Sequence, residues 1–349
     1  MSREAANEAA KHPDWFSSEG IYNLGNTRPL LPLAVDPPGH AKYRKILDPL
    51  FAPKRMDAIE DAIASRAAHF IDPLVGQGHC EYHDDFAVPF PSAIFLELMG
   101  LPWEELDTFL RLKDGILRPG GGDVDLETMA RIQAETGQEI YAYFDAVLDQ
   151  RSREPREDIL SHFLSAEVDG HRLSREEILD ICFLFLIAGL DTVTDTLSCF
   201  YAFLATHPDH RRMITEDPTV IPRAVEELLR WESPVPNPPR LVTTDSELCG
   251  EKIPAGSVLQ LGLGAANVDP EVIECPFDVR FDREVNPHIA FGVGVHRCLG
   301  SHLARRELRV ALREWHRRIP DYELVPGTEL RWPVGLRSCE NLQLQWPPR

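Results

Sequence analysis

Apolar side chains recur at helical spacing along most of the chain. The stretch MDAIEDAIASRAAHFI, residues 56–71, has the apolar period that is typical of an amphipathic helix. Another helix is expected in DPPGHAKYRKILDPLF, residues 36–51, with Asp36 as the N-cap and prolines in the first turn. The same pattern predicts further helices near residues 91–99, 103–117, 125–151, 174–207, 208–216, 219–232 and 301–318.

Strand-like patterns occur mainly in the final third of the chain. Alternating or β-branched residues with turn punctuation are found in RLVTTD (240–245), ELCGEKIPAGSVLQLGL (247–263) and CENLQLQW (339–346). The glycine-rich RPGGGDVD at 118–125 predicts a loop. The expected fold class is therefore mainly α with a minor β part, an α+β arrangement. Because no Ser/Gly-rich linker divides the chain, residues 1–349 are expected to form one domain.

Composition limits the cellular location and the classes of partner that can be expected. The formal net charge of -20 argues against nucleic acid or an anionic membrane as the general partner. The longest apolar run, ICFLFLIAGL at 181–190, is shorter than the ~20 residues that span a bilayer, and it predicts a buried core helix. The 7 cysteines have no paired spacing, and the opening segment lacks the apolar core of a secretion signal. These features predict reduced thiols and a cytoplasmic location.

One cysteine has unusual surroundings. Cys298 lies in FGVGVHRCLG, residues 291–300, directly before the predicted helix at 301–318. The dipole and unpaired N–H groups at a helix start stabilise an anion such as a thiolate. Glycines at 292, 294 and 300 allow sharp turns and a close approach to something large and flat. A thiolate ligand of a heme iron satisfies these features, whereas an ordinary buried cysteine is only a small hydrophobic side chain.

FGVGVHRCLG resembles the heme-binding loop of the cytochromes P-450, the heme-thiolate monooxygenases. The resemblance covers the whole chain, from about residue 1 to the C-terminus, and looks closest to bacterial soluble members of the camphor-hydroxylase type. It implies heme b as the cofactor and Cys298 as the axial ligand of its iron. The loop matches the family pattern at Phe291, Gly292, Gly294, Arg297, Cys298 and Gly300, and Phe291, Gly292 and Gly300 are expected to bind the cofactor.

A second motif, AGLDTV at 188–193, lies inside the long apolar stretch, where an acid and an alcohol are costly. Gly189 weakens the helix at the same point and indicates a widened groove. In the family this pair supplies protons for the reduction of dioxygen, so the resemblance gives Asp191 and Thr192 that catalytic role. The residues alone leave an alternative open, in which Thr192 bonds back to a carbonyl and Asp191 faces solvent.

Two further sets of residues follow the family order. Glu227 and Arg230 in EELLRW are three residues apart on a helix, and the resemblance implies a buried structural pair that braces the heme loop. Heme propionates need cationic partners. The resemblance assigns this role to four positions, each of which would singly be an ordinary surface charge: His40, Arg44, Arg240 and His296.

The resemblance also implies a mainly apolar pocket above the heme, suited to a small or medium hydrophobic substrate. Segments 19–32 and 109–130 are expected near its walls. Tyr22 and Asn237 are candidate hydrogen-bond anchors, although either is equally able to face solvent. The expected pocket residues are Tyr22, Ile187, Leu190, Val193, Val235, Pro236, Asn237 and Leu336.

Electrons are expected from outside the chain. No flavin, nicotinamide or iron–sulfur fingerprint is present, since the partial GLGAAN at 262–267 is too weak. The implied partners are dioxygen and an external ferredoxin with its NAD(P)H-dependent reductase. A basic face near Cys298 would suit an acidic ferredoxin, although a solvated helix face explains the same cations. These are Arg305, Arg306, Arg309, Arg313, Lys42 and Lys45.

The chain departs from the family pattern at its start, because the N-terminal helix and the first sheet strands are absent. The late strands are therefore expected to present an open sheet edge. Two other functions stay open. A truncated or degenerate heme-binding protein without turnover is motivated by the shortened start. A peroxygenase driven by hydrogen peroxide is disfavoured by the intact Asp191–Thr192 pair.

Overall fold

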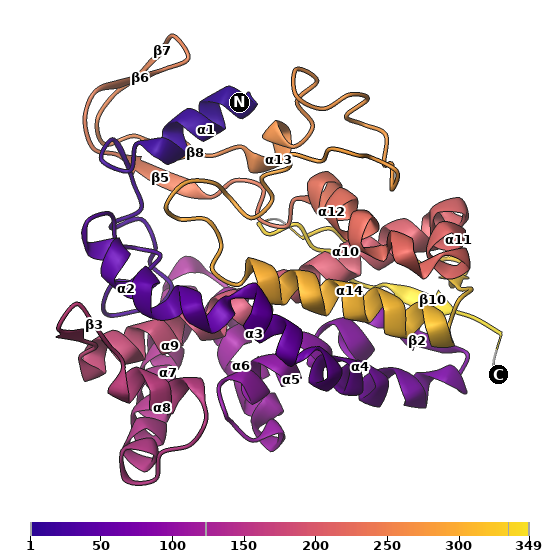
Figure 1. The fold of residues 1–349 in the computed structure, drawn as a ribbon, viewed down its shortest axis with the longest axis horizontal. Helices are drawn as coiled ribbons and strands as arrows, with labels where there is room; N and C mark the ends of the chain where they lie inside the picture. Colours follow the sequence, from indigo (N-terminus) through magenta and orange to yellow (C-terminus); the bar gives the residue numbers. More distant parts are fainter. Residues whose placement is uncertain (1, 123, 334, 348–349) are drawn as a thin grey trace.

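The structure is a computed structural model that describes residues 2–122, 124–333 and 335–347. Helices make up most of the molecule, and small sheets lie at its edges (Figure 1). This arrangement confirms the mainly α fold class with a minor β part. No helix in the described part of the chain is long and apolar enough to cross a membrane.

Helix boundaries follow local start signals. The α-helices of the described residues are α1 (Arg3–Lys11), α2 (Gly39–Leu47), α3 (Pro53–Ala58), α4 (Glu60–Val75), α5 (Pro89–Leu98), α6 (Leu106–Leu117), α7 (Leu126–Arg153), α8 (Ile159–Ser165), α9 (Arg175–Leu190), α10 (Thr192–Thr206), α11 (Pro208–Glu216), α12 (Ile221–Glu232), α13 (Leu263–Ala266) and α14 (Ser301–Arg318). Asp125 caps α7, and Ser174 with Glu177 forms a capping box at the start of α9. Short 3-10 or π turns are η1 (Asp48–Phe51), η2 (His83–Ala87), η3 (Trp103–Glu105), η4 (Pro119–Gly122) and η5 (Pro218–Val220).

The strands are short and antiparallel. They are β1 (Phe16–Ser17), β2 (His79–Glu81), β3 (Glu167–Val168), β4 (His171–Arg172), β5 (Pro239–Val242), β6 (Ser246–Leu248), β7 (Glu251–Ile253), β8 (Val258–Gln260), β9 (Glu323–Leu324) and β10 (Gln343–Gln345). Two three-stranded sheets have the orders β1-β5-β8 and β2-β10-β9, while β3–β4 and β6–β7 pair as separate hairpins. The sequence pattern therefore predicted the late strands but missed β1 to β4 and β9.

The core consists of three clusters of buried side chains. One lies where α4, α10, α12 and α14 meet, around the fully buried Trp315. The second joins α2, α5, α6, α7, α8 and α9. A smaller third cluster lies between α1, β5 and α13, which are neighbours in Figure 1. Apolar burial of this extent is the main force that holds the helices together.

The expectation of an open edge is wrong for β5, which is paired on both sides. Phe16 lies opposite Val242 on one side, and Arg240 lies opposite Leu259 on the other. Phe16 is 1% exposed and belongs to the third core cluster. The N-terminal β1 therefore supplies a partner because its aromatic side chain gains burial there.

Two local predictions about helices need correction. The stretch 174–207 is two helices, because the chain breaks at Asp191 between α9 and α10. The hydroxyl of Thr192 donates to the carbonyl of Ala188 at 3.1 Å, a contact that commonly bends a helix. The stretch 56–71 is similarly divided at Ile59, between α3 and α4.

The predicted N-cap at Asp36 is also wrong. Helix α2 starts at Gly39 after Pro38, and no side chain caps it. The Asp36 carboxylate instead accepts hydrogen bonds from the Ser17 hydroxyl and the Ser18 N–H. The prolines separate Asp36 from the first helical N–H groups, so its carboxylate is available to other partners.

Candidate active site

The loop at 291–300 is closed by backbone hydrogen bonds. The Cys298 N–H donates to the Phe291 carbonyl at 2.8 Å, and the Gly292 N–H donates to the Ile289 carbonyl at 2.8 Å. Gly292 and Gly294 have φ angles of 72° and 73°, in the left-handed region that favours glycine. The Cys298 side chain is exposed and lies two residues before Gly300, the N-cap of α14.

The protein surroundings raise the pKa of the Cys298 thiol. Desolvation by nearby protein atoms is the largest cause, while the Gly300 backbone and the positive charges of Arg44, Arg297 and Arg305 act in the opposite direction. The thiol therefore needs a further cation to become a thiolate at neutral pH. An iron ion would supply that charge, because a thiol that coordinates a metal is deprotonated.

The glycines of the loop have different tasks. A Cβ on Gly294 would lie 2.3 Å from the carbonyl oxygen of Ala10, so this glycine lets the loop contact the end of α1. A Cβ on Gly300 would meet no protein atom within 4 Å. The sequence interpretation, in which all the glycines make room for a flat group, is therefore wrong for Gly294.

The residues predicted to bind propionates come together beside the loop. The rings of His40 and His296 have centroids 4.6 Å apart. Arg44 donates from Nη1 to the Arg297 carbonyl at 2.8 Å and so joins α2 to the loop. Arg240, which is 7% exposed, acts electrostatically on His296. Four basic groups from α2, β5 and the loop thus surround one region.

Both histidines of this group are disfavoured as cations. Burial, the charge of His296 and the charge of Arg44 lower the pKa of His40 to about 4. Burial, Arg240 and Arg44 lower the pKa of His296, although Asp36 raises it. Both rings are therefore neutral donors at neutral pH, and an anionic ligand beside them would raise their pKa values.

Asp36 is a member of this group that the sequence reasoning assigned elsewhere. His296 donates from Nε2 to the Asp36 carboxylate, with the nitrogen 3.1 Å from the oxygen. Because a carboxylate only accepts hydrogen bonds, this contact places the proton of the neutral ring on Nε2. The sequence signal for Asp36 is the DPP turn at 36–38, because Asp36 lies only four residues before His40 in the chain.

These residues fit the heme that the resemblance implies. One protein thiolate is enough to hold a heme iron axially, so no multi-ligand metal cluster is required. Within the described residues, no group of three or more His, Cys, Asp or Glu side chains is arranged to hold a metal ion. The buried Arg240, the half-buried Arg44 and the ring N–H groups beside Cys298 are the donors that propionate carboxylates need.

The second motif lies at the break between α9 and α10. Asp191 is 3% exposed, and its Oδ1 accepts from Lys113 Nζ at 3.0 Å and from Arg118 Nη1 at 3.1 Å. Thr192 is half-buried and bonds back to Ala188. The Thr192 hydroxyl therefore bonds back to a carbonyl, as the alternative to the proton-supply role expected. Asp191 does not follow that alternative, because it is buried and does not face solvent.

The sequence reasoning missed Lys113, Arg118 and Asp195, which surround Asp191. Lys113 is 2% exposed, which is unusual for a lysine, and it comes from α6. Asp195 lies one turn after Asp191 and is 0% exposed. Burial and the Asp191 charge raise the pKa of Asp195 to about 7. Only TDT at 194–196, an acid inside an apolar helix, could have drawn attention to Asp195.

Gly189 has a packing role near this break. A Cβ at this position would lie 2.9 Å from Cδ2 of Phe95 on α5. The glycine therefore lets α9 approach α5 closely, a reason that the sequence pattern did not indicate.

Glu227 and Arg230 form a buried ion pair. The Arg230 Nη2 lies 2.8 Å from Glu227 Oε1, and their side chains are 0% and 1% exposed. Arg283 Nε also donates to Glu227 at 3.0 Å, and Asn286 donates to its second oxygen at 3.0 Å. Arg230 additionally donates to the carbonyls of Asn267, Pro276 and Asp278. This network connects α12 to the segment that leads into the loop.

The expected pocket residues differ in burial and belong to different parts of the core. Ile187 and Leu190 belong to the second core cluster, and Val193 belongs to the first. Tyr22 is half-buried and hydrogen-bonds to Arg240. The remaining positions are partly buried or exposed: Val235, Pro236 and Leu336 are half-buried and Asn237 is exposed.

The expected basic face is largely neutralised by ion pairs. Arg305 and Arg309 pair with Glu226, and Arg306 and Arg313 pair with Glu60. Lys42 pairs with Glu177, and Lys45 pairs with Asp169. The sequence could not show these ion pairs, because the partner carboxylates come from α4, α9, α12 and a turn that are distant in sequence.

Comparison with known proteins agrees with this geometry. The model of the family described as "Cytochrome P450" matches residues 123–315. A probable cytochrome P450 127A1 of Sinorhizobium fredii is 35% identical over 325 residues, which are 93% of this chain and 76% of that protein. A steroid C26-monooxygenase of Mycobacterium tuberculosis is 34% identical over 353 residues, which are 99% of this chain and 94% of that protein.

Solved structures have the same fold. The crystal structure of P450BioI with an acyl carrier protein that carries hexadec-9Z-enoic acid superposes with a TM-score of 0.90 at 27% identity. The structure of CYP109E1 from Bacillus megaterium with corticosterone also has a TM-score of 0.90, at 28% identity. Each alignment covers 99% of this chain and 91% of the other.

Proposed function

The chain belongs to the cytochrome P450 family of heme b monooxygenases, and we propose that it hydroxylates a small or medium hydrophobic molecule with dioxygen and two electrons from an external ferredoxin. Residues 1–349 act in this proposal as a single domain. The observation that supports it best is the convergence of basic groups from α2, β5 and the loop beside Cys298.

In this proposal the Cys298 thiolate would hold the heme iron. Heme b, when bound, supplies the activation of dioxygen. Arg44 and Arg240 neutralise the propionates, and His40 donates a hydrogen bond to them. The Nε2–H of His296 is bound to Asp36, so His296 donates to a propionate from Nδ1, after the propionate charge has raised its pKa and the ring is protonated. The positions that border the cofactor are Phe291, Gly292 and Gly300. The helix start at Gly300 adds backbone N–H groups that stabilise a thiolate.

Asp191 and Thr192 are the proposed proton donors. Lys113 and Arg118 hold the Asp191 carboxylate inside the protein at 3.0 and 3.1 Å. Thr192 lies at the helix break with its hydroxyl half-buried and bound to a carbonyl, so it can accept a proton while it donates one. An acid beside a hydroxyl is the arrangement that general acid catalysis needs.

The substrate class follows from apolar residues and from the names of relatives. We place Ile187, Leu190 and Val193 near the substrate because they flank the Asp191 break. Half-buried Val235, Pro236 and Leu336 add apolar surface, and Tyr22 or Asn237 supplies a hydrogen bond. Relatives include a steroid C26-monooxygenase and a methyl-branched lipid omega-hydroxylase. Steroids and methyl-branched lipids are therefore the first molecules to test.

The ferredoxin is proposed to bind near Arg297. This exposed arginine precedes Cys298, and its guanidinium forms no ion pair within the described residues. The neighbouring arginines of α14 are already paired, so Arg297 offers the available positive charge for an acidic partner. A neutral Arg297→Gln variant should lower the electron-transfer rate most at low ionic strength.

The test of the proposed function uses Cys298→Ser beside a matched variant, Cys275→Ser. Cys275 is also exposed but lies outside the loop. The reduced carbon monoxide complex should show the thiolate-type spectrum in the wild type and in Cys275→Ser, and should lose it in Cys298→Ser. Persistence of that spectrum in Cys298→Ser would refute the ligand assignment.

The same protein separates the remaining functions. Steroids and lipids are added while the heme absorbance is followed, and product is measured with ferredoxin and its reductase or with hydrogen peroxide. Product that forms only with the redox partners supports the monooxygenase. Product with peroxide alone would support a peroxygenase, and heme uptake without any product would support a binding protein.

A further inference from the structure

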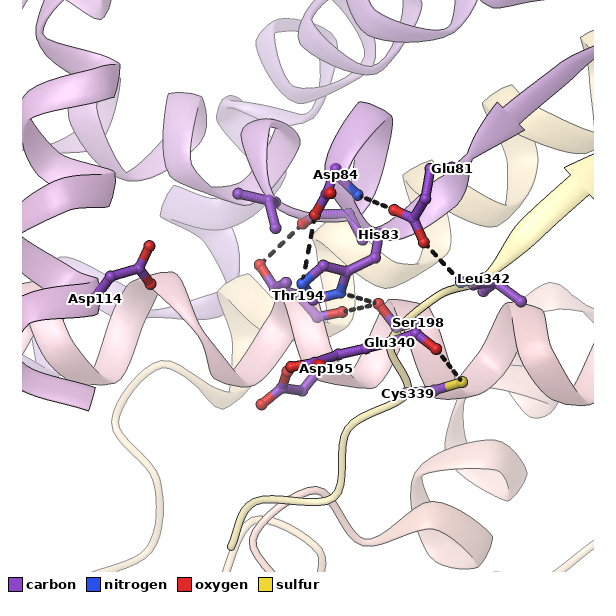
Figure 2. A network of polar contacts seen from close by, with 12 residues as sticks. Glu81, His83, Asp84, Asp114, Thr194, Asp195, Ser198, Cys339, Glu340 and Leu342 are labelled. Carbon is purple, nitrogen blue, oxygen red and sulfur yellow. Dashed lines mark hydrogen bonds and ion pairs between the residues drawn. The ribbon is translucent and has the colours of Figure 1, made fainter. Parts of the chain in front are cut away.

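Asp195 is a buried acid that the proposed function does not use. It is 0% exposed, and neither of its carboxyl oxygens has a hydrogen-bond partner within the described residues. Figure 2 shows the contrast with its neighbours on α10: Thr194 and Ser198 donate to backbone carbonyls, and no contact reaches the Asp195 carboxyl from the residues drawn. An ionised carboxylate without donors is strongly disfavoured in such a place.

Arg118 lies between this acid and Asp191. Its Nη1 is 3.1 Å from Asp191 Oδ1, which is hydrogen-bond distance, whereas its Nη2 is 3.7 Å from Asp195 Oδ1. Lys113 adds a second cation to Asp191 at 3.0 Å. The buried Lys113 and the half-buried Arg118 therefore hydrogen-bond to Asp191, and Asp195 receives only a longer electrostatic contact.

The other groups that face Asp195 do not favour its ionisation strongly. The Ser338 hydroxyl from the C-terminal segment lowers its pKa, and the Cys199 thiol comes from the next turn of α10. Two more carboxylates lie on the outer side of the cations. Asp114 is 3.2 Å from Lys113 and Glu340 is 4.0 Å from Arg118, with side chains 54% and 35% exposed. Four acids thus face two cations, an imbalance that one added proton reduces.

We propose that Asp191 and Asp195 are a carboxyl pair that holds one proton near neutral pH, with the proton on Asp195 at rest and Arg118 as the cation common to both. This inference rests on the proposed role of Asp191 as a proton donor. Two nearby carboxylates that share a proton titrate as one unit, and each stage belongs to the pair. Asp195 is then a positioning residue that acts through Asp191.

The proton balance of the pair is simple. The proton of Asp195 first moves to Asp191 and leaves Asp195 ionised, and Asp191 then gives that proton to the oxygen side of the site, so both carboxyl groups are ionised until one proton returns. The negative charge moves along Arg118, which contacts both acids, so it stays beside a cation throughout. A proton from solvent, entering past Asp114 or Glu340, then restores Asp195.

Infrared spectroscopy tests this pair without reference to turnover. The heme-loaded wild-type protein should show the C=O stretching band of a buried, protonated carboxyl group, and this band should disappear as the pH rises through neutrality. Asp195→Asn should abolish the band, and Asp195→Glu should restore a titrating band at a shifted frequency. Asp209→Asn, a control that alters an exposed acid paired with Arg212 outside this network, should leave the band unchanged.

Several results would overturn the inference. They are the absence of a titrating carboxyl band in the wild type, its survival in Asp195→Asn, and its loss in Asp209→Asn. The wild-type measurement needs no variant. The inference can therefore be contradicted even if the Asp195→Asn protein does not fold. Failure of the proposed function is measured separately. If replacing Thr192 does not change the ratio of product formed to dioxygen consumed, the proposed role of Thr192 is wrong, but the carboxyl band is unaffected.

The pH dependence of unfolding is a second measurement. Burial and the Asp191 charge raise the pKa of Asp195 from its ordinary value of 3.8 to about 7 in the folded protein. The folded protein therefore binds the proton more tightly than the unfolded chain, so its stability falls as the pH rises through this interval. Asp195→Asn should lose that part of the pH dependence, whereas an unchanged curve would contradict a proton on Asp195.

Discussion

At the scale of single residues, the chemistry at the helix break depends on how two neighbours divide their contacts. Asp191 is bound by Lys113 and Arg118, so its carboxylate is fixed inside the protein. Thr192 has only a carbonyl partner and remains half-buried. The acid is therefore held by two cations, and the adjacent hydroxyl, bound only to a carbonyl, is the group that we propose passes the proton.

Replacing Thr192 tests this division. Thr192→Ala removes the hydroxyl and should lower the ratio of product formed to dioxygen consumed by about tenfold or more, because a positioned acid–base group is lost. Thr192→Ser keeps the hydroxyl and should preserve most of the coupling. Parallel measurement of dioxygen uptake and product checks this, and equal coupling in the two variants would contradict the assignment.

At the scale of elements, the cysteine loop is held by its contact with α1. Gly294 is in the left-handed region at φ 73°. A Cβ at this position would lie 2.3 Å from the carbonyl oxygen of Ala10, which is too close for a side chain to fit. The last turn of α1 thus limits where the loop before α14 can lie. An N-terminal element that the sequence alone left unconnected contributes to the position of Cys298.

The substitution Gly294→Ala measures that contact. Its clash should cost about 1–3 kcal/mol of unfolding free energy beyond the backbone penalty, and should weaken heme retention. Gly250→Ala is the matched control, because Gly250 has φ 85° but open space where a Cβ would lie. It should show only the left-handed penalty of roughly 1–2 kcal/mol. Denaturant unfolding of both variants compares them, and equal losses would remove the role of α1.

At the scale of the whole molecule, the Glu227 network connects the helical body to the long irregular segment before the cysteine loop. Glu227 accepts from Arg230, Arg283 and Asn286, and the Arg280 N–H also donates to it. Segment 267–286 has little regular structure, so side-chain hydrogen bonds replace the backbone ladder that would otherwise hold it.

Neutralising Glu227 should therefore affect the entire fold. Glu227→Gln leaves two buried guanidinium groups without their counterion and should cost about 3–5 kcal/mol of unfolding free energy. Asp209→Asn, which breaks the exposed pair with Arg212, should cost no more than about 1 kcal/mol. Chemical denaturation checks both, and a small effect at Glu227 would show that the network is not needed for stability.

Much of this architecture was available in local patterns. Apolar periodicity located α4, α7 and α14 to within a few residues, because each buries one face over several turns. It could not show the break at Asp191, nor that the carboxylate there binds cations from α6 and the turn after it. Nor could it show β1, a two-residue strand that exists only by pairing with β5.

The sequence by itself determined the family and the chemistry of the cysteine loop, because those signals depend on residues that are close along the chain. Only the tertiary structure decided which charges meet. It paired the arginines of α14 with distant acids, brought Asp36 to His296, and buried Asp195 behind Arg118. The physical reason is that ion pairing and desolvation depend on distance and burial in the folded molecule, which chain order does not specify.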